Sequence, residues 1–176
     1  AEKKGKRCFK PSNVQFGISV FCFYLLLFSL LQGCTGNNST RFSIIDPVQS
    51  KVAFSNDLNY TEDYNPYTYR NFYNGGGVAL GAVNNDVLLD IYFSGNLVPN
   101  KLYLNKGGFE FEDITEQAGV ACAEVWSSGI NMVDVNGDGW LDIYVCKAGK
   151  PEGENRHNEL FINQGDLTFK EESEAY

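Results

Sequence analysis

The stretch that decides the fold runs from Gly129 to Val145 and reads Gly-Ile-Asn-Met-Val-Asp-Val-Asn-Gly-Asp-Gly-Trp-Leu-Asp-Ile-Tyr-Val. A shift of 52 residues lays it over the segment from Gly77 to Phe93, where Gly, Val, Asn, Asp, Leu, Asp, Ile and Tyr recur in register. With six extra residues in the second copy, Asn100–Gly107 also matches Asn158–Gly165. A long match at a fixed period indicates a protein built from repeated structural units.

Each copy contains apolar runs of three to five residues separated by Asn, Asp and Gly. This punctuation predicts short strands joined by turns rather than helices. Four strands are expected in the first copy, at Val78–Gly81, Asp90–Ser94, Lys101–Asn105 and Phe109–Glu112. Four more are expected in the second copy, at Ile130–Val133, Asp142–Cys146, Glu159–Asn163 and Thr168–Glu171.

Four short antiparallel strands repeated at this period are typical of a β-propeller blade. The sequence therefore predicts an all-β fold with two four-stranded blades, at residues 75–126 and 127–176. A closed propeller needs at least about four blades. We therefore expect either a fragment of a longer protein, whose remaining blades complete the propeller, or self-association through exposed sheet edges.

The segment Asp134–Asp142 predicts a calcium-binding loop between two strands. Ca²⁺ prefers about six to eight hard oxygen ligands. The side chains of Asp134, Asn136 and Asp138, the carbonyl of Trp140 and the carboxylate of Asp142 are the expected ligands, and Gly139 permits the turn. An EF-hand would carry Glu where this chain has Val145, so the loop is expected to join strands. The alternative is a solvated turn rich in Asn and Asp.

The equivalent loop of the first copy is degraded. It keeps Asn84, Asp86 and Asp90 as weak candidate ligands, but Ala82 stands at the first ligand position and Val87 at the position of the loop glycine. A valine is strained where the backbone favours positive φ. The sequence predicts one good metal site and one weak or empty site.

The first 33 residues are typical of an export signal. A basic stretch precedes the apolar run Ile18–Leu31, which is short for a membrane span. The run ends in Leu31-Gln32-Gly33-Cys34, which resembles the lipobox of bacterial lipoproteins. That resemblance implies a lipid on Cys34, a polar tether over residues 34–40, and a location at the cell envelope, in the outer membrane of a Gram-negative bacterium. An ordinary cleaved signal or a short membrane anchor is the alternative.

Charge excludes one class of partner. The chain carries 22 acidic and 14 basic side chains, and five of the basic ones lie within residues 1–10. Nucleic-acid binding through phosphate neutralisation needs clustered Lys and Arg, so it is not expected. In an oxidising envelope Cys122 and Cys146 could pair, but two cysteines give no spacing framework, and a buried free thiol is equally compatible.

The lead-in at residues 41–74 is rich in aromatic residues. We expect its cluster to pack beneath the first blade, although such rings could also form a platform on which sugars stack. The cluster comprises Tyr64, Tyr67, Tyr69, Phe72 and Tyr73.

The repeats resemble the FG-GAP or VCBS blades of integrin-like propellers and of large secreted bacterial proteins. The resemblance is carried by Asn74–Ala79, Asp90–Phe93, Asn100–Asn105 and Phe111–Thr115, together with Val52–Asn56 ahead of the first blade. These segments are similar to bacterial envelope lipoproteins that join such repeats to an ASPIC and UnbV module, which this chain lacks. The resemblance implies a non-enzymatic, calcium-binding propeller for protein or glycan recognition, and Ala82 and Val87 weaken that implication for the first blade.

The rival function is part of an extracellular polysaccharide-processing enzyme. Such an enzyme should present paired acids together with a base or nucleophile. The single histidine, His157, ends a polar insert and is best interpreted as a solvated loop residue. No catalytic residue is therefore expected.

Overall fold

The computed structural model describes residues 41–122, 126–148 and 157–175. Contacts divide the chain after Ser43, and everything discussed below belongs to the unit Ile44–Tyr176. The predicted signal segment, the tether and Cys34 lie outside the described residues, as does the insert at residues 149–156.

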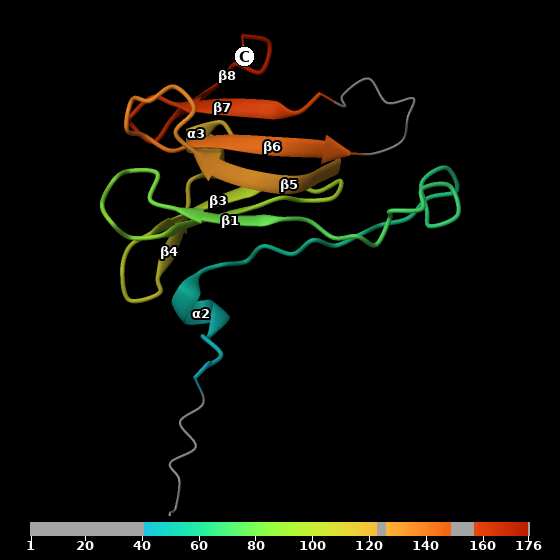
Figure 1. Ribbon diagram of the computed structural model, residues 1–176. Helices are drawn as coiled ribbons and strands as arrows, with labels where there is room; N and C mark the ends of the chain where they lie inside the picture. Colours follow the sequence, from blue (N-terminus) through green and yellow to red (C-terminus); the bar gives the residue numbers. More distant parts are fainter. Residues whose placement is uncertain (1–40, 123–125, 149–156, 176) are drawn as a thin grey trace, which may run out of the picture. The chain divides into compact units, whose positions relative to one another are not determined.

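The fold is all-β and contains two four-stranded sheets (Figure 1). The first sheet contains β1 (Val78–Gly81), β2 (Asp90–Phe93), β3 (Lys101–Asn105) and β4 (Phe111–Asp113). The second contains β5 (Trp126–Val133), β6 (Asp142–Ala148), β7 (Glu159–Asn163) and β8 (Phe169–Glu171). In both sheets the strands pair antiparallel in chain order, which confirms the predicted pair of blades.

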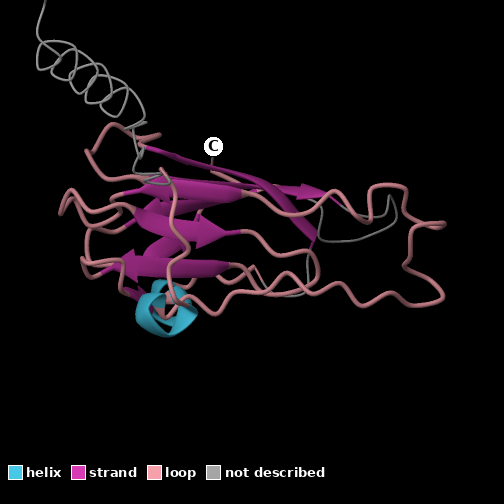
Figure 2. Ribbon diagram, turned by 90° about the horizontal axis from the view of Figure 1, so that it is seen from below, coloured by secondary structure: helices cyan, strands magenta, loops and turns pink. Residues whose placement is uncertain are grey.

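Several element bounds differ from the sequence prediction: β2 ends at Phe93, β6 continues to Ala148 and β8 starts at Phe169. β5 starts at Trp126 because its ladder with β6 continues beyond an irregularity between Ser127 and Ile130. β4 starts at Phe111 because Phe109 has a φ of 61° and belongs to the turn. Two single-turn helices, α2 (Pro47–Ser50) and α3 (Thr115–Ala118), were not predicted, and loops connect the remaining elements (Figure 2). Each helix ends in a left-handed residue, which stops it after one turn.

The sheets pack against each other through one apolar core. Tyr92, Leu102 and Leu104 of the first sheet meet Ile143, Val145 and Phe161 of the second. The segment around α3 closes this core with Ile114, Ala118 and Val120, all buried. Because the hydrophobic side chains of both sheets share one cluster, neither sheet buries its core residues alone.

Polar contacts also join the sheets. The side chain of Asn96 donates to the carbonyl of Ser127 at 2.8 Å, and the hydroxyl of Ser94 donates to the carbonyl of Ser128 at 2.8 Å. Gly77 has no room for a side chain, since a Cβ there would lie 2.5 Å from the Ser128 carbonyl oxygen. The glycine at this position is therefore needed for the close approach of the two blades.

The aromatic lead-in does not pack as predicted. Tyr64, Tyr69 and Phe72 surround Trp126 of β5, with ring centroids 5.5, 5.1 and 5.6 Å from its ring. Burial in this cluster, followed by the effect of Tyr69, raises the pKa of Tyr64 to about 12. The prediction of packing beneath the first blade was thus wrong for these rings, because Trp126 opens the second sheet.

Cys122 and Cys146 are both free thiols. Cys122 donates to Glu159 at 2.8 Å, and Glu159 also pairs with the buried ammonium group of Lys147. Burial and the Glu159 carboxylate raise the pKa of the Cys122 thiol, which makes it a poor nucleophile. Within the described ranges, helices are too short and too polar to cross a bilayer.

Candidate metal centre

The loop between β5 and β6 folds around the carboxylate of Asp134. One Asp134 oxygen accepts from the backbone N–H of Gly137 at 2.7 Å and of Asp138 at 3.2 Å, and the other accepts from Gly139 at 2.9 Å. These N–H groups, that of Gly139 foremost, lower the pKa of Asp134. Gly137 and Gly139 have φ values of 77° and 89°, which glycine adopts without strain.

Asn136 and Asp138 continue the same loop. The Asn136 amide donates to Asp138 at 2.8 Å and accepts from the Asp138 N–H at 2.9 Å. Asp138 in turn accepts from the Trp140 N–H at 2.8 Å. The first three predicted ligands are therefore brought together on one exposed loop, each bonded within the loop itself.

Asp142 has a different environment. It is fully buried at the start of β6, and its two oxygens accept from the Val135 N–H at 3.0 Å and the Asn163 N–H at 2.9 Å. This carboxylate links the loop to β7, a role that sequence reasoning did not assign.

The first blade repeats this arrangement. Asp90, also fully buried, accepts from the Val83 N–H at 2.8 Å and the Asn105 N–H at 2.8 Å. Burial raises the pKa of Asp90, and the two N–H donors oppose that rise. Asn84 donates to Asp86 at 2.8 Å, as Asn136 does to Asp138.

The two loops differ where the sequence said they would. Ala82 offers no carboxylate at the position of Asp134. Val87 has a φ of 65°, in the region where a β-branched residue is strained, whereas the second blade has Gly139 there. Val87 thus adopts the positive φ that the sequence comparison indicated, and strain there stays a prediction.

Two asparagines complete the pattern. Asn105 donates to the carbonyl of Leu89 at 2.9 Å, and Asn163 donates to that of Leu141 at 3.1 Å. Asn163 also donates to the carbonyl of Val83 at 2.8 Å and so joins the blades. Sequence reasoning used these residues only to align the repeats, although their recurrence in register was the signal for a shared structural role.

The donor set fits a hard cation by its chemistry. Asp134 and Asp138 are carboxylates, and a carboxylate accepts about four contacts, so their oxygens keep acceptor capacity beyond the bonds in the loop. Among the residues that the structure describes, however, no three His, Cys, Asp or Glu side chains are gathered closely enough to hold a metal ion. The loop thus has suitable ligands without a formed cage.

The two loops are neighbours. The Asn85 side chain in the first donates to the Gly139 carbonyl in the second at 3.1 Å. His157 lies elsewhere, in an exposed hollow with Tyr144, Asn158 and Glu174.

Part of the chain is similar in sequence to a known family of repeats. Residues 83–145, which run from the first loop to the middle of β6, match the family described as FG-GAP-like repeat. The match covers most of the first loop, the second loop and the strands between them, and the chain is similar to that family over these residues.

The chain is also similar to cartilage acidic protein 1 of Xenopus tropicalis. It is 38% identical over 74 residues, which amounts to 42% of this chain. The matched region spans only 11% of that relative's length. The likeness therefore concerns one part of a much longer protein.

Proposed function

We propose that this chain is a non-enzymatic recognition module of the FG-GAP type, in which a calcium-binding loop stabilises a surface that binds a protein or glycan ligand. The observation that carries the proposal is the pair of adjacent loops, on two packed blades, that share one hydrogen-bonding pattern. Loops held in place by a rigid scaffold are common sites of recognition.

Calcium is proposed for the second loop alone. Asp134, Asn136 and Asp138 would hold it through side-chain oxygens and Trp140 through its carbonyl, while Asp142, whose two oxygens accept from Val135 and Asn163, ties the loop to β7. The lowered pKa of Asp134 supports this, since an ionised carboxylate is the form that binds a cation. An ion that binds the folded chain alone stabilises it by about 2.7 kcal/mol at a concentration of 100 Kd.

Calcium titration of the purified chain tests the proposal. We expect calorimetry to give one site, and we expect the melting temperature to rise with Ca²⁺ and fall again with EDTA. Asp134→Asn should abolish both effects. Asp138→Asn should weaken both, whereas Asp86→Asn, the matched change at the equivalent position of the first loop, should leave both unchanged. Two equal sites, no site, or a melting temperature insensitive to EDTA would contradict the proposal.

A gain-of-site variant makes the test sharper. Ala82→Asp combined with Val87→Gly gives the first loop the missing carboxylate and the missing glycine. We expect this variant to bind a second equivalent of calcium. Unchanged stoichiometry would mean that these two positions are not what distinguishes the loops.

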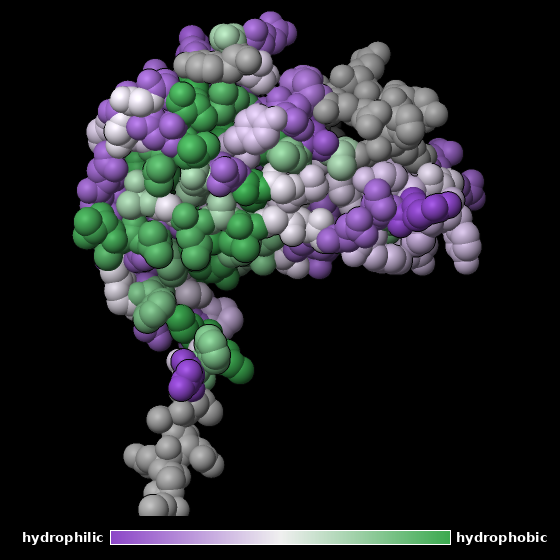
Figure 3. All heavy atoms as spheres, viewed as in Figure 1, coloured by the Kyte–Doolittle hydropathy of each residue, from purple (hydrophilic) through white to green (hydrophobic). Residues whose placement is uncertain are grey.

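A further blade is proposed as a partner. Val78, Leu80 and Leu89 are 58%, 58% and 54% exposed, and Figure 3 shows hydrophobic side chains gathered over this part of the surface. Their counterparts in the second blade are Ile130, Met132 and Leu141; Met132 and Leu141 lie directly over Gly81 of β1. The exposed residues of the first blade thus correspond to the residues through which the second blade packs on the first. A further blade, from a longer chain or a second copy, would pack on them in the same way.

Envelope anchoring through Cys34 is proposed from Leu31–Cys34 alone. A multi-chain lipid anchor holds a protein at a membrane without a spanning helix. The outer membrane of a Gram-negative bacterium is the proposed location.

A further inference from the structure

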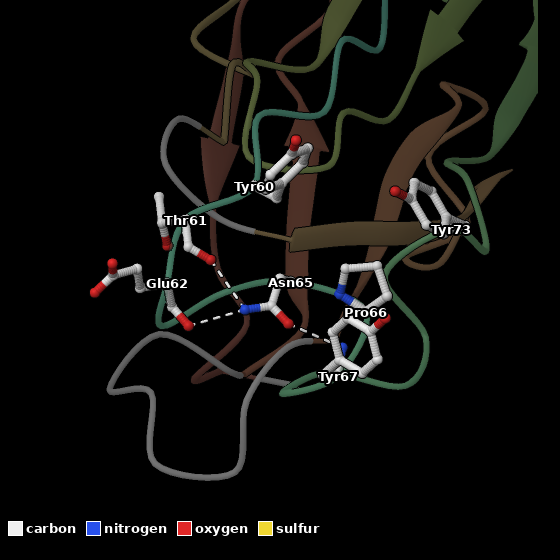
Figure 4. A pocket seen from close by; sticks show the side chains of 7 residues that line it. All are labelled: Tyr60, Thr61, Glu62, Asn65, Pro66, Tyr67 and Tyr73. Atoms are coloured by element: carbon white, nitrogen blue, oxygen red, sulfur yellow. Dashed lines mark hydrogen bonds between the residues drawn. The ribbon is translucent and has the colours of Figure 1, made fainter.

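The aromatic residues of the segment 60–73 divide into two sets. Tyr64, Tyr69 and Phe72 pack around Trp126. Tyr60, Tyr67 and Tyr73 are instead 72%, 100% and 70% exposed. These three rings line a hollow of about 740 Å³ together with Thr61, Glu62, Asn65 and Pro66 (Figure 4).

The wall of the hollow is held in one conformation by Asn65. Its amide nitrogen donates to the carbonyls of Thr61 at 3.0 Å and Glu62 at 2.8 Å. Its amide oxygen accepts from the N–H groups of Tyr67 at 2.9 Å and Thr68 at 3.3 Å. The packing of the buried rings on Trp126 fixes the base of the same segment. The exposed rings therefore lie on a pre-organised support, which lowers the entropic cost of binding a ligand.

The lining favours a ligand with both apolar and hydroxylated faces. Tyrosine rings present a negative π face that attracts C–H groups, and their hydroxyls remain at the wet end to exchange hydrogen bonds. A sugar ring presents C–H groups on its faces and hydroxyls around its edge.

Charge and backbone bonding narrow the ligand class further. The chain has a net charge of −8, and no Lys or Arg lines the hollow, so an anionic ligand is disfavoured. A peptide that binds as an added β-strand would need free backbone groups to pair with. The backbone N–H groups of this segment are instead used within it, by Thr61, Tyr64, Asn65, Tyr67, Thr68 and Tyr69.

We infer that the hollow formed by Tyr60, Tyr67 and Tyr73 binds a neutral carbohydrate. This inference rests on the proposed function and deepens it, because it names the ligand class and places its site away from the calcium loop. Tyr67 and Tyr73 supply stacking surfaces, and the tyrosine hydroxyls exchange hydrogen bonds with the sugar hydroxyls.

Native affinity electrophoresis tests the inference. The full chain is run in gels containing laminarin, xyloglucan, galactomannan or dextran, in a detergent without a sugar headgroup. We expect at least one of these neutral polysaccharides to retard the chain. Tyr67→Ala and Tyr73→Ala should each weaken that affinity about tenfold, as expected for the loss of an aromatic anchor.

Phe109→Ala is the matched control, since it removes an aromatic side chain that is 62% exposed and lies outside the hollow. It should bind as the original chain does. The melting temperature of every variant reports folding, and the rise of that temperature with Ca²⁺ reports the proposed calcium site. The inference would be overturned if no gel retards the chain, even if calcium binding persists. It would also be overturned if the Tyr67 and Tyr73 variants were retarded as strongly as the original chain. Binding of a labelled proline-rich decapeptide without any polysaccharide binding would overturn it in favour of a peptide site.

Discussion

Asp90 and Asp142 show how one residue can serve the fold in both repeats. Each is fully buried, and each carboxylate accepts from a backbone N–H seven residues earlier and from an Asn N–H on the third strand of its sheet. A buried carboxylate is tolerated where hydrogen bonds replace its hydration. The loop of each blade is thereby tied to its sheet.

Asp142→Asn should therefore destabilise the chain, because the amide must turn an N–H₂ group toward either the Val135 or the Asn163 N–H. A buried unsatisfied donor costs about 1–3 kcal/mol, so we expect a loss of about 3 kcal/mol in the free energy of unfolding once the lost charge is included. Urea unfolding followed by tryptophan fluorescence, in EDTA to remove metal effects, measures it. Asp138→Asn, on the exposed loop, should cost less than about 1 kcal/mol. Equal costs would mean that burial of Asp142 is unimportant.

At the scale of elements, the repeat made the strands predictable. β1, β3 and β7 have the predicted bounds because apolar runs end at Asn or Gly on both sides. The beginning of β5 and the helix α3 were missed, since they depend on contacts distant in sequence: Trp126 bridges to Asn96, and the Thr115 hydroxyl at the start of α3 accepts from the Leu102 N–H. The candidate ligands were found by spacing, but spacing could not reveal that Asp142 bonds to β7.

The turn after β1 is expected to carry the strain that its sequence implies. A left-handed backbone costs an L-residue about 1–2 kcal/mol, and Val87→Gly removes this cost. The greater conformational entropy of glycine in the unfolded chain offsets part of the gain, so the variant should be more stable by about 1 kcal/mol. Val87 is 90% exposed, so little packing is lost. Thermal or urea unfolding measures the change. Val78→Gly, in the extended strand β1, should instead destabilise by about 1 kcal/mol. A destabilised Val87→Gly variant would argue against strain at this position.

At the scale of the whole molecule, equivalent apolar residues of the two blades differ in their exposure. The second blade buries apolar residues on the first, while the first exposes the equivalent residues Val78, Leu80 and Leu89. Contiguous exposed apolar surface on a folded protein marks an interaction site. Because the exposed surface differs from the one it would meet, the proposed association would be head-to-tail rather than two-fold.

Leu80→Glu should accordingly reduce self-association. Sedimentation velocity over a range of concentrations should show larger species for the original chain and a shift toward monomer for the variant, because a charge would be buried in the contact. Phe109→Glu places the same charge on an exposed turn and should leave the distribution unchanged. A chain that is monomeric at every concentration would rule out self-association through this surface.

The hydrogen bond from Asn85 to the Gly139 carbonyl gives the degraded loop a role of its own. A shift of the Gly139 peptide group would lengthen or break this contact with Asn85 on the neighbouring blade. The nuclear magnetic resonance signal of the Asn85 side-chain amide would therefore change whenever the opposite loop rearranges. The first loop, which lacks the first carboxylate, therefore offers a spectroscopic probe of the second loop, which retains it.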